Sequence, residues 1–269
     1  MHRFMNPPVD AVLQHPPKLH IRRMGRADNH ALPVVMLHGA FTGSLASWWM
    51  TCAPRVAKFN PVVLYDLRGH GLSQRPAEGY RLADHLDDLA RVTAGLGPCA
   101  LVGHSLGGWI AIEAARAWPD RVSALVGVDV PIGAKRPRTS HEAAEADTAS
   151  KGTPRARRRH HQLTLAETSF RSDLAAEAPL DVADLASLRC PTLMAFGRQS
   201  PFVDGAELAR AALGTNSVQM FDGGHALHLD ATADLSDAIT QFLSGPAITT
   251  TTTATTSPKG TAEPDHAHG

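Results

Sequence analysis

Cysteine is scarce in this sequence, and so are long apolar runs. The chain has only Cys52, Cys99 and Cys190, widely spaced and without a Cys-x-x-Cys pair. This odd number favours reduced thiols in a cytoplasmic protein and offers no metal site. No apolar run approaches the roughly 18 residues of a membrane-spanning helix, and the N-terminal residues lack the apolar core of a signal peptide. We therefore expect a soluble, cytoplasmic protein.

Neither sign of charge is in excess. Lys and Arg number 26, and Asp and Glu also number 26, so the overall charge favours neither nucleic acid nor an acidic partner. One local basic run at residues 155–161 is typical of a solvated face. Apolar residues make up 43% of the 269 residues and charged ones 19%. This composition is ordinary for one globular domain with a buried core.

Short apolar runs alternate with amphipathic segments along most of the chain. The runs predict strands at residues 34–37, 62–65, 100–102, 124–128, 192–196 and 217–221, after a half-buried edge strand at 19–23. The segments between them predict helices at residues 47–59, 82–96, 106–118, 206–213 and 231–243. This alternation indicates an α/β fold with a mostly parallel central sheet flanked by helices. Ligands bind such sheets beyond the carboxyl ends of the strands.

The alternation is interrupted once. Residues 131–187 begin with a stretch rich in Ala, Arg, Lys, Ser and Thr and continue with apolar residues at helical spacing. This pattern predicts a short helical lid insertion with a disordered front part. Residues 246–269 are rich in Thr and predict a disordered tail. The core is then expected at residues 19–130 and 188–245, after a loose lead-in at 1–17.

The stretch Gly103-His-Ser-Leu-Gly107 follows an expected strand and precedes an expected helix. Gly-x-Ser-x-Gly in this setting is a nucleophile elbow, in which the turn is too tight for a Cβ at the flanking positions. Ser105 is then held in a strained conformation with its hydroxyl above the sheet. The N-terminal amides of the helix that follows favour negative charge at the same place.

Three further motifs surround the elbow in chain order. They are His38-Gly-Ala-Phe41, Asp66-Leu-Arg-Gly-His-Gly-Leu-Ser73 and Gly223-Gly-His225. With these stretches the chain resembles the α/β-hydrolase superfamily, and in particular its single-domain serine esterase-like members, over about residues 19–243. The resemblance implies the α/β-hydrolase fold with a short helical lid.

The resemblance also implies roles for individual residues. Ser105 would be the nucleophile and His225 the general base that activates it, because a serine hydroxyl is a weak nucleophile without an adjacent base. The backbone amides of Ala40 and Leu106 would form the oxyanion hole. This chemistry needs neither a metal nor an organic cofactor. Structural roles are expected for four polar residues of the same motifs: His38, Asp66, Arg68 and His70.

The acid that should orient His225 departs from the pattern of the superfamily. Most members carry Asp three residues after the Gly that ends the strand at 192–196, and here Ser200 stands at that position. Asp129 is the preferred acid, because it ends the strand after the elbow helix, where some members supply the acid. Asp204 is the second choice, and a site without an acid is the third.

The expected function is that of a serine hydrolase acting on a small-molecule ester, thioester or related acyl substrate through an acyl-enzyme. Ser105 disfavours dehalogenases and epoxide hydrolases, which use Asp there, and His104 disfavours carbon–carbon bond hydrolases, which usually have Asn. A non-hydrolytic lyase, cyclase or acyltransferase on the same scaffold, a carbon–carbon bond hydrolase and a catalytically inactive binding protein are the alternatives. The expected pocket residues are Phe41, Trp109, Phe202 and Leu227.

Overall fold

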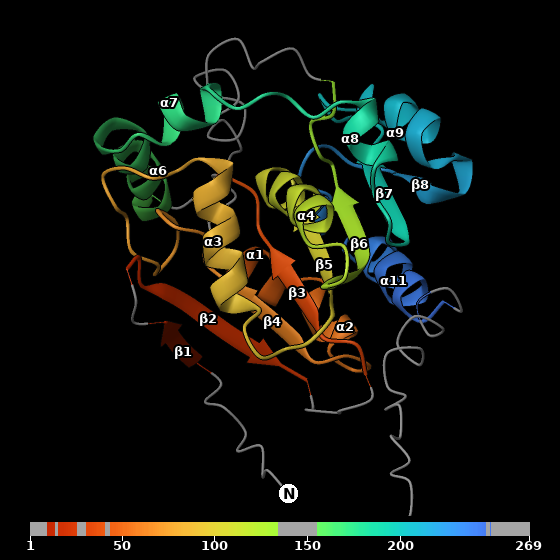
Figure 1. Cartoon of the computed structure of the whole chain (residues 1–269), viewed down its shortest axis with the longest axis horizontal. Coiled ribbons are helices and arrows are strands. Elements are labelled where there is room, and N and C mark those ends of the chain that lie inside the picture. The colour runs from red at the N-terminus through yellow and green to blue at the C-terminus, as the bar shows by residue number, and fades with distance from the viewer. Residues whose placement is uncertain are drawn as a thin grey trace, which may run out of the picture.

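The central sheet has eight strands in the order β1-β2-β4-β3-β5-β6-β7-β8 (Figure 1). The computed structural model describes residues 10–13, 16–25, 31–40, 44–133, 155–245 and 248. The strands are β1 (Asp10–Leu13), β2 (Leu19–Met24), β3 (Val34–Leu37), β4 (Val62–Tyr65), β5 (Cys99–His104), β6 (Val122–Val128), β7 (Thr192–Gly197) and β8 (Val218–Phe221). β2 pairs antiparallel with both β1 and β4, and all other pairs are parallel. The predicted α/β fold with a mostly parallel sheet is confirmed.

Helices cover both faces of this sheet. One face carries α3 (Leu82–Val92), α4 (Leu106–Ala117), α8 (Val182–Ala186) and α9 (Gly205–Leu213). The other carries α1 (Ala46–Trp49), α2 (Ala53–Val56), α10 (Leu227–Asp230) and α11 (Thr232–Leu243). A 3-10 turn, Thr215–Ser217, precedes β8. Along β3, Val35 and Leu37 pack under the first set of helices, and Val34 and Met36 under the second. Successive side chains of a strand point to opposite faces, so an all-apolar run fits a strand buried on both.

The register brings three strand ends together. His104 at the end of β5 pairs with Val128 at the end of β6, and Val128 pairs with Ala195 in β7. The ladder continues past the strands, because the Ser105 amide donates to the Val128 carbonyl at 2.9 Å and the Asp129 amide to the Ala195 carbonyl at 2.7 Å. The residues that follow β5, β6 and β7 therefore lie side by side.

Several local expectations differ from the structure. The single helix expected at 47–59 is two short ones, α1 and α2, with Pro54 in the first turn of α2. Proline has no amide hydrogen and clashes with the carbonyl of the preceding turn, so it begins a helix more readily than it continues one. The expected lead-in at 1–17 contains β1, which pairs with β2 from Asp10↔Arg22 to Leu13↔Leu19. The strand expected at 19–23 is therefore not at the edge of the sheet, because β2 lies between β1 and β4.

Two helices of the expected lid segment, α6 (Arg155–Glu167) and α7 (Phe170–Ala175), lie at the end of the sheet toward which β3 and β6 point (Figure 1). They contact the loop after β4: Thr164 Oγ1 donates to the Gly69 carbonyl at 2.9 Å, and the Tyr80 amide donates to Asp173 Oδ2 at 2.8 Å. Phe170 also packs edge-on against Tyr80, with ring centroids 5.5 Å apart.

Residues 134–154 of the expected lid, and the expected tail apart from Ile248, lie outside the described residues. The lid therefore stays a prediction. None of the helices in the described segments has the length and apolarity needed to cross a bilayer.

Candidate active site

Ser105 stands between β5 and α4 in a conformation that few residues adopt. Its φ is 51° and its ψ is −118°. A Cβ added to Gly103 would lie 2.2 Å from the Gly107 carbonyl oxygen, and one added to Gly107 would lie 2.5 Å from the Leu37 carbonyl oxygen. Because both contacts are with backbone, no side-chain movement could relieve them. The turn therefore requires glycine on both sides of Ser105, as the elbow motif predicts.

The two segments that carry the expected oxyanion-hole amides meet at Ser105. Leu106 is the first residue of α4, so its amide has no acceptor within the helix. The loop after β3 comes close on the other side, since a Cβ on Gly39 would lie 3.1 Å from the Ser105 Cβ. Ala40 follows this point of contact directly. The two amides expected to bind an oxyanion thus belong to segments that meet at Ser105, and their role there stays a prediction.

His225 lies at the same edge of the sheet, after β8 and the Gly223-Gly224 turn. Its Nδ1 is 2.6 Å from Asp129 Oδ2. An ionised carboxylate only accepts hydrogen bonds, so Nδ1 carries the proton and donates it, which leaves Nε2 as the basic nitrogen. The ring is held on two further sides, edge-on by Phe202 at a centroid distance of 4.9 Å and by the tilted ring of His104 at 4.6 Å.

Asp129 ends β6 with its side chain fully buried. Its φ of 49° is one of two positive values among the described non-glycine residues, and Ser105 has the other. Three donors converge on its carboxylate. The Gly197 amide donates to Oδ1 at 3.0 Å, and both the Ser200 hydroxyl and His225 donate to Oδ2. These hydrogen bonds compensate the burial of a charged group.

Asp204, the second choice for the acid, lies elsewhere. It is exposed and immediately precedes α9. Within the described part of the chain no hydrogen bond or ion pair joins it to His225. The contacts therefore favour Asp129 over Asp204 as the partner of His225.

The four expected pocket residues differ in their surroundings. Phe202 contacts the His225 ring, as described above. Trp109 lies one helical turn after Ser105 and is partly exposed, while its Nε1 is buried without a hydrogen-bond partner in the described structure. Leu227 has no exposed surface and packs into the core under α10 and α11, so it does not line an open pocket. Phe41 lies outside the described residues.

Two residues that sequence reasoning left without a role support the His225 loop. His104 Nε2 lies 2.8 Å from the His225 carbonyl oxygen and must donate to it, since a carbonyl only accepts. Burial holds the pKa of His104 well below its usual range, so the ring is neutral. Asp230 Oδ2 accepts from the Gly224 amide at 2.8 Å. The sequence shows Asp230 five residues after His225, but this spacing alone does not indicate which backbone amide the carboxylate binds.

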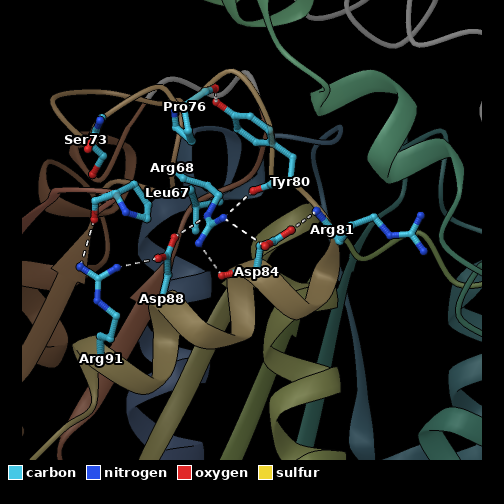
Figure 2. Close-up of polar contacts among 12 residues, drawn as sticks. Leu67, Arg68, Ser73, Pro76, Tyr80, Arg81, Asp84, Asp88 and Arg91 are labelled. Atoms are coloured by element: carbon cyan, nitrogen blue, oxygen red, sulfur yellow. Dashed lines mark hydrogen bonds and ion pairs between the residues drawn. The ribbon is translucent and has the colours of Figure 1, made fainter. Parts of the chain in front are cut away.

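The loop after β4 is braced by buried polar groups. Asp66 accepts from the Leu45 amide at 2.7 Å and the Leu72 amide at 2.9 Å. Arg68, shown in Figure 2, donates to Asp88 Oδ2 at 2.7 Å, to the Asp84 carbonyl at 2.7 Å and to the Gly79 carbonyl. Asp66 thus joins the loop to the segment before α1, and Arg68 joins it to α3.

The two histidines of the same motifs also make backbone contacts. His38 Nε2 accepts from the Leu67 amide at 3.0 Å, and its Nδ1 lies 2.8 Å from the Gly39 carbonyl oxygen. His70 Nδ1 lies 2.9 Å from the Arg68 carbonyl oxygen. Burial holds the pKa of His70 well below its usual range. The His38 ring therefore joins the loop after β3 to the loop after β4, and the His70 ring contacts the backbone of its own loop.

A cleft of about 720 Å³ lies beside the loop after β4. Its wall includes three strongly exposed apolar side chains, Met50, Leu72 and Leu229. Neither Ser105 nor His225 is among the described residues that line it, so the cleft does not define the substrate pocket. Within the described ranges, no group of three or more His, Cys, Asp or Glu side chains could hold a metal ion.

Known proteins resemble this chain in sequence and in fold. A family model described as the alpha/beta hydrolase family matches residues 34–238. A 2-(acetamidomethylene)succinate hydrolase of Mesorhizobium japonicum is 44% identical over 69 residues, which are 25% of this chain and 25% of that protein. A putative carbamate hydrolase of Cronobacter sakazakii is 39% identical over 98 residues, which are 35% of this chain and 37% of that protein. The matched stretches thus span only about a quarter to a third of these relatives.

A solved structure matches over a greater length. A carboxylesterase of Bacillus subtilis superposes with a TM-score of 0.71 over 88% of this chain and 91% of that chain. The two sequences are 21% identical. At this identity the likeness shows the fold and nothing finer.

Proposed function

Because the chain belongs to the alpha/beta hydrolase family, we propose that it is a serine hydrolase acting on a small-molecule ester, thioester or related acyl compound. The observation that carries the proposal is the 2.6 Å contact between His225 Nδ1 and Asp129 Oδ2 at the strand ends beside Ser105. A proton on Nδ1 leaves Nε2 free to act as a base. The relatives described above are themselves hydrolases.

In the proposed reaction the Ser105 hydroxyl attacks the acyl carbon while His225 Nε2 accepts its proton. The amides of Ala40 and Leu106 donate to the oxyanion of the tetrahedral intermediate, an interaction for which one donor contributes a factor of about 10² to 10³ in rate. The protonated His225 then gives its proton to the leaving alcohol or thiol, and an acyl-enzyme remains on Ser105. Water, deprotonated by the same nitrogen, attacks the ester and releases the acid.

The strained backbone at Ser105 fits this role. A non-glycine residue with positive φ costs of order 1–3 kcal/mol, and such residues are concentrated at functional sites. Here the strain is held by two glycines and by the start of α4, so the hydroxyl stays at the end of the sheet. The neighbouring helix terminus favours the negative charge that develops during attack.

The test is hydrolysis of short-chain aryl esters by the wild-type protein and by Ser105→Ala. We expect a burst of aryl alcohol from the wild type, a mass increase of one acyl group on Ser105, and the loss of both in the variant. Ser187→Ala is the matched control, because Ser187 is an exposed serine after α8. It should keep wild-type turnover.

Two results would separate the alternatives. Absence of both turnover and acyl adduct in the wild type would contradict a serine hydrolase and favour a non-hydrolytic enzyme or a binding protein on this scaffold. An adduct that is transferred to an added amine or alcohol, and not to water, would indicate an acyltransferase.

A further inference from the structure

We propose that Ser200 is a positioning residue that holds the Asp129 carboxylate in place for His225, an inference that rests on the proposed function. Ser200 is 5% exposed. Its hydroxyl donates to Asp129 Oδ2, the same oxygen that binds His225 Nδ1. Ser200 occupies the position where most members of the superfamily carry the acid, and it contacts the Asp129 carboxylate directly.

The direction of this hydrogen bond follows from its neighbours. The Phe202 amide donates to Ser200 Oγ at 3.0 Å, so the hydroxyl oxygen is already an acceptor. An ionised carboxylate has no proton to give. The hydroxyl proton of Ser200 must therefore point at Asp129 Oδ2. The hydroxyl thus donates to Asp129, which follows β6, and accepts from Phe202 within the turn after β7.

The turn of residues 197–200 donates a hydrogen bond to each oxygen of the Asp129 carboxylate. The Gly197 amide donates to Oδ1 at 3.0 Å while the Ser200 hydroxyl donates to Oδ2. The turn itself is closed by a bond from the Ser200 amide to the Gly197 carbonyl at 3.1 Å. Two donors on two oxygens fix the rotation of the Asp129 carboxyl group, which one donor cannot do.

The same turn is joined to the loop that carries His225. The Arg198 amide donates to the Phe221 carbonyl at 2.9 Å, and the Gln199 amide donates to the Gly223 carbonyl at 3.0 Å. The carboxylate and the imidazole are thus aligned by one short segment. Among the described residues of this segment, only Ser200 contacts the Asp129 carboxylate through its side chain, so Ser200 is the residue to change.

Removal of the hydroxyl has three chemical consequences. Oδ2 loses one of its two donors, so its hydrogen bond with His225 Nδ1–H becomes stronger and the imidazolium is favoured. Of the two donors in the turn after β7 only the Gly197 amide remains, so the carboxyl group and the imidazole bonded to it can rotate together away from the productive orientation. The Phe202 amide also loses its acceptor. Ser200→Thr keeps the hydroxyl and with it the acceptor of the Phe202 amide, so it controls for the third consequence.

The experiment compares wild type, Ser200→Ala and Ser200→Thr, since threonine keeps the hydroxyl. For Ser200→Ala we expect kcat to fall about tenfold with KM unchanged, the order of effect of one hydrogen bond to a charged group. The acidic limb of the kcat/KM profile should move to higher pH. In proton NMR the low-field resonance of His225 Nδ1–H should move downfield. Ser200→Thr should restore the wild-type profile and resonance.

A Ser200→Ala protein with the wild-type resonance and pH profile would overturn the proposal, even if its stability were lower. The NMR measurement needs no substrate, so it separates the two proposals. A shifted resonance in a protein that hydrolyses no ester would contradict the proposed function and leave the role of Ser200 toward Asp129 standing.

Discussion

His225 Nδ1 lies 2.6 Å from Asp129 Oδ2, although 96 positions separate the two residues in the chain. The contact exists because β6 and β8 flank β7 in the sheet, so the residues after both strands come out at the same edge. The aspartate is fully buried and the histidine partly exposed. This arrangement supports the proposal that His225 is a general base oriented by Asp129.

Replacement of this carboxylate tests its assignment. We expect Asp129→Asn to lower kcat for an aryl ester by about 10³- to 10⁴-fold, because an amide can hold His225 in the wrong tautomer. Asp204→Asn is the matched control, since Asp204 is exposed and its side chain makes no capping hydrogen bond with α9. It should stay within about twofold of wild type. Equal activity of Asp129→Asn and wild type would contradict the assignment of Asp129 as the acid that orients His225.

The closeness of position 200 to the same carboxylate predicts a transfer of the acid. Ser200 Oγ is already hydrogen-bonded to the oxygen that binds His225. Because an aspartate side chain is longer than serine by one atom, a carboxylate at position 200 should reach Nδ1. We expect Asp129→Asn/Ser200→Asp to be at least about tenfold more active than Asp129→Asn alone. Asp129→Asn/Ser200→Asn is the control, and equal rates for the two double variants would contradict the prediction.

The buried pair of Arg68 and Asp88 predicts a stability effect away from the site (Figure 2). Their side chains are 7% and 1% exposed. Arg68→Met should lower the free energy of unfolding by about 3 kcal/mol, because the buried Asp88 loses its closer partner and keeps only Arg91, at 3.1 Å. Arg55→Met should cost under about 1 kcal/mol, because Arg55 and Asp237 form an exposed pair. Urea denaturation measures both.

A double variant distinguishes loss of the pair from loss of packing. In Arg68→Met/Asp88→Leu neither charge is left buried alone, so part of the lost stability should return. If this double variant is less stable than Arg68→Met, the ion pair is not the cause of the effect.

His85 predicts a pH dependence of stability. The side chain is fully buried in α3, and both ring nitrogens lack a hydrogen-bond partner in the described structure. Burial, with a smaller effect of the Arg68 charge, lowers the pKa of His85 from 6.5 to about 3. A depressed pKa means that unfolding takes up a proton. This part of the stability is therefore complete above pH 6.5 and is lost as the pH falls toward 3.

His85→Phe removes this proton uptake. Between pH 7 and pH 5 the variant should lose about 2 kcal/mol less stability than wild type, since the slope per proton is about 1.4 kcal/mol per pH unit. Urea denaturation at the two pH values gives the difference. His70 and His104, whose pKa values are also lowered by burial, still contribute in the variant. Parallel losses in the two proteins would contradict the prediction.

Much of the fold could be predicted because its signals are local. The strands expected at 34–37 and 62–65 have the bounds of β3 and β4, since each is a four-residue apolar run buried on both faces. The position of Ser105 could also be predicted from the sequence, because the tight turn around it requires glycine two positions away on either side. The break between α1 and α2 was missed although Pro54 is visible in the sequence, because the apolar spacing continues across it.

The partner of His225 has no comparable local signal. Asp129 and Asp204 are both aspartates after or near an expected strand, and only the register of β5, β6 and β7 separates them. The contact of Ser200 with Asp129 and the burial of Leu227 likewise depend on how distant segments pack. Apolar periodicity and tight turns depend on residues a few positions apart, so they can be recognised in the sequence. Hydrogen bonds between strand ends form only when the sheet has brought those ends together, and only there do Asp129, Ser200 and His225 meet.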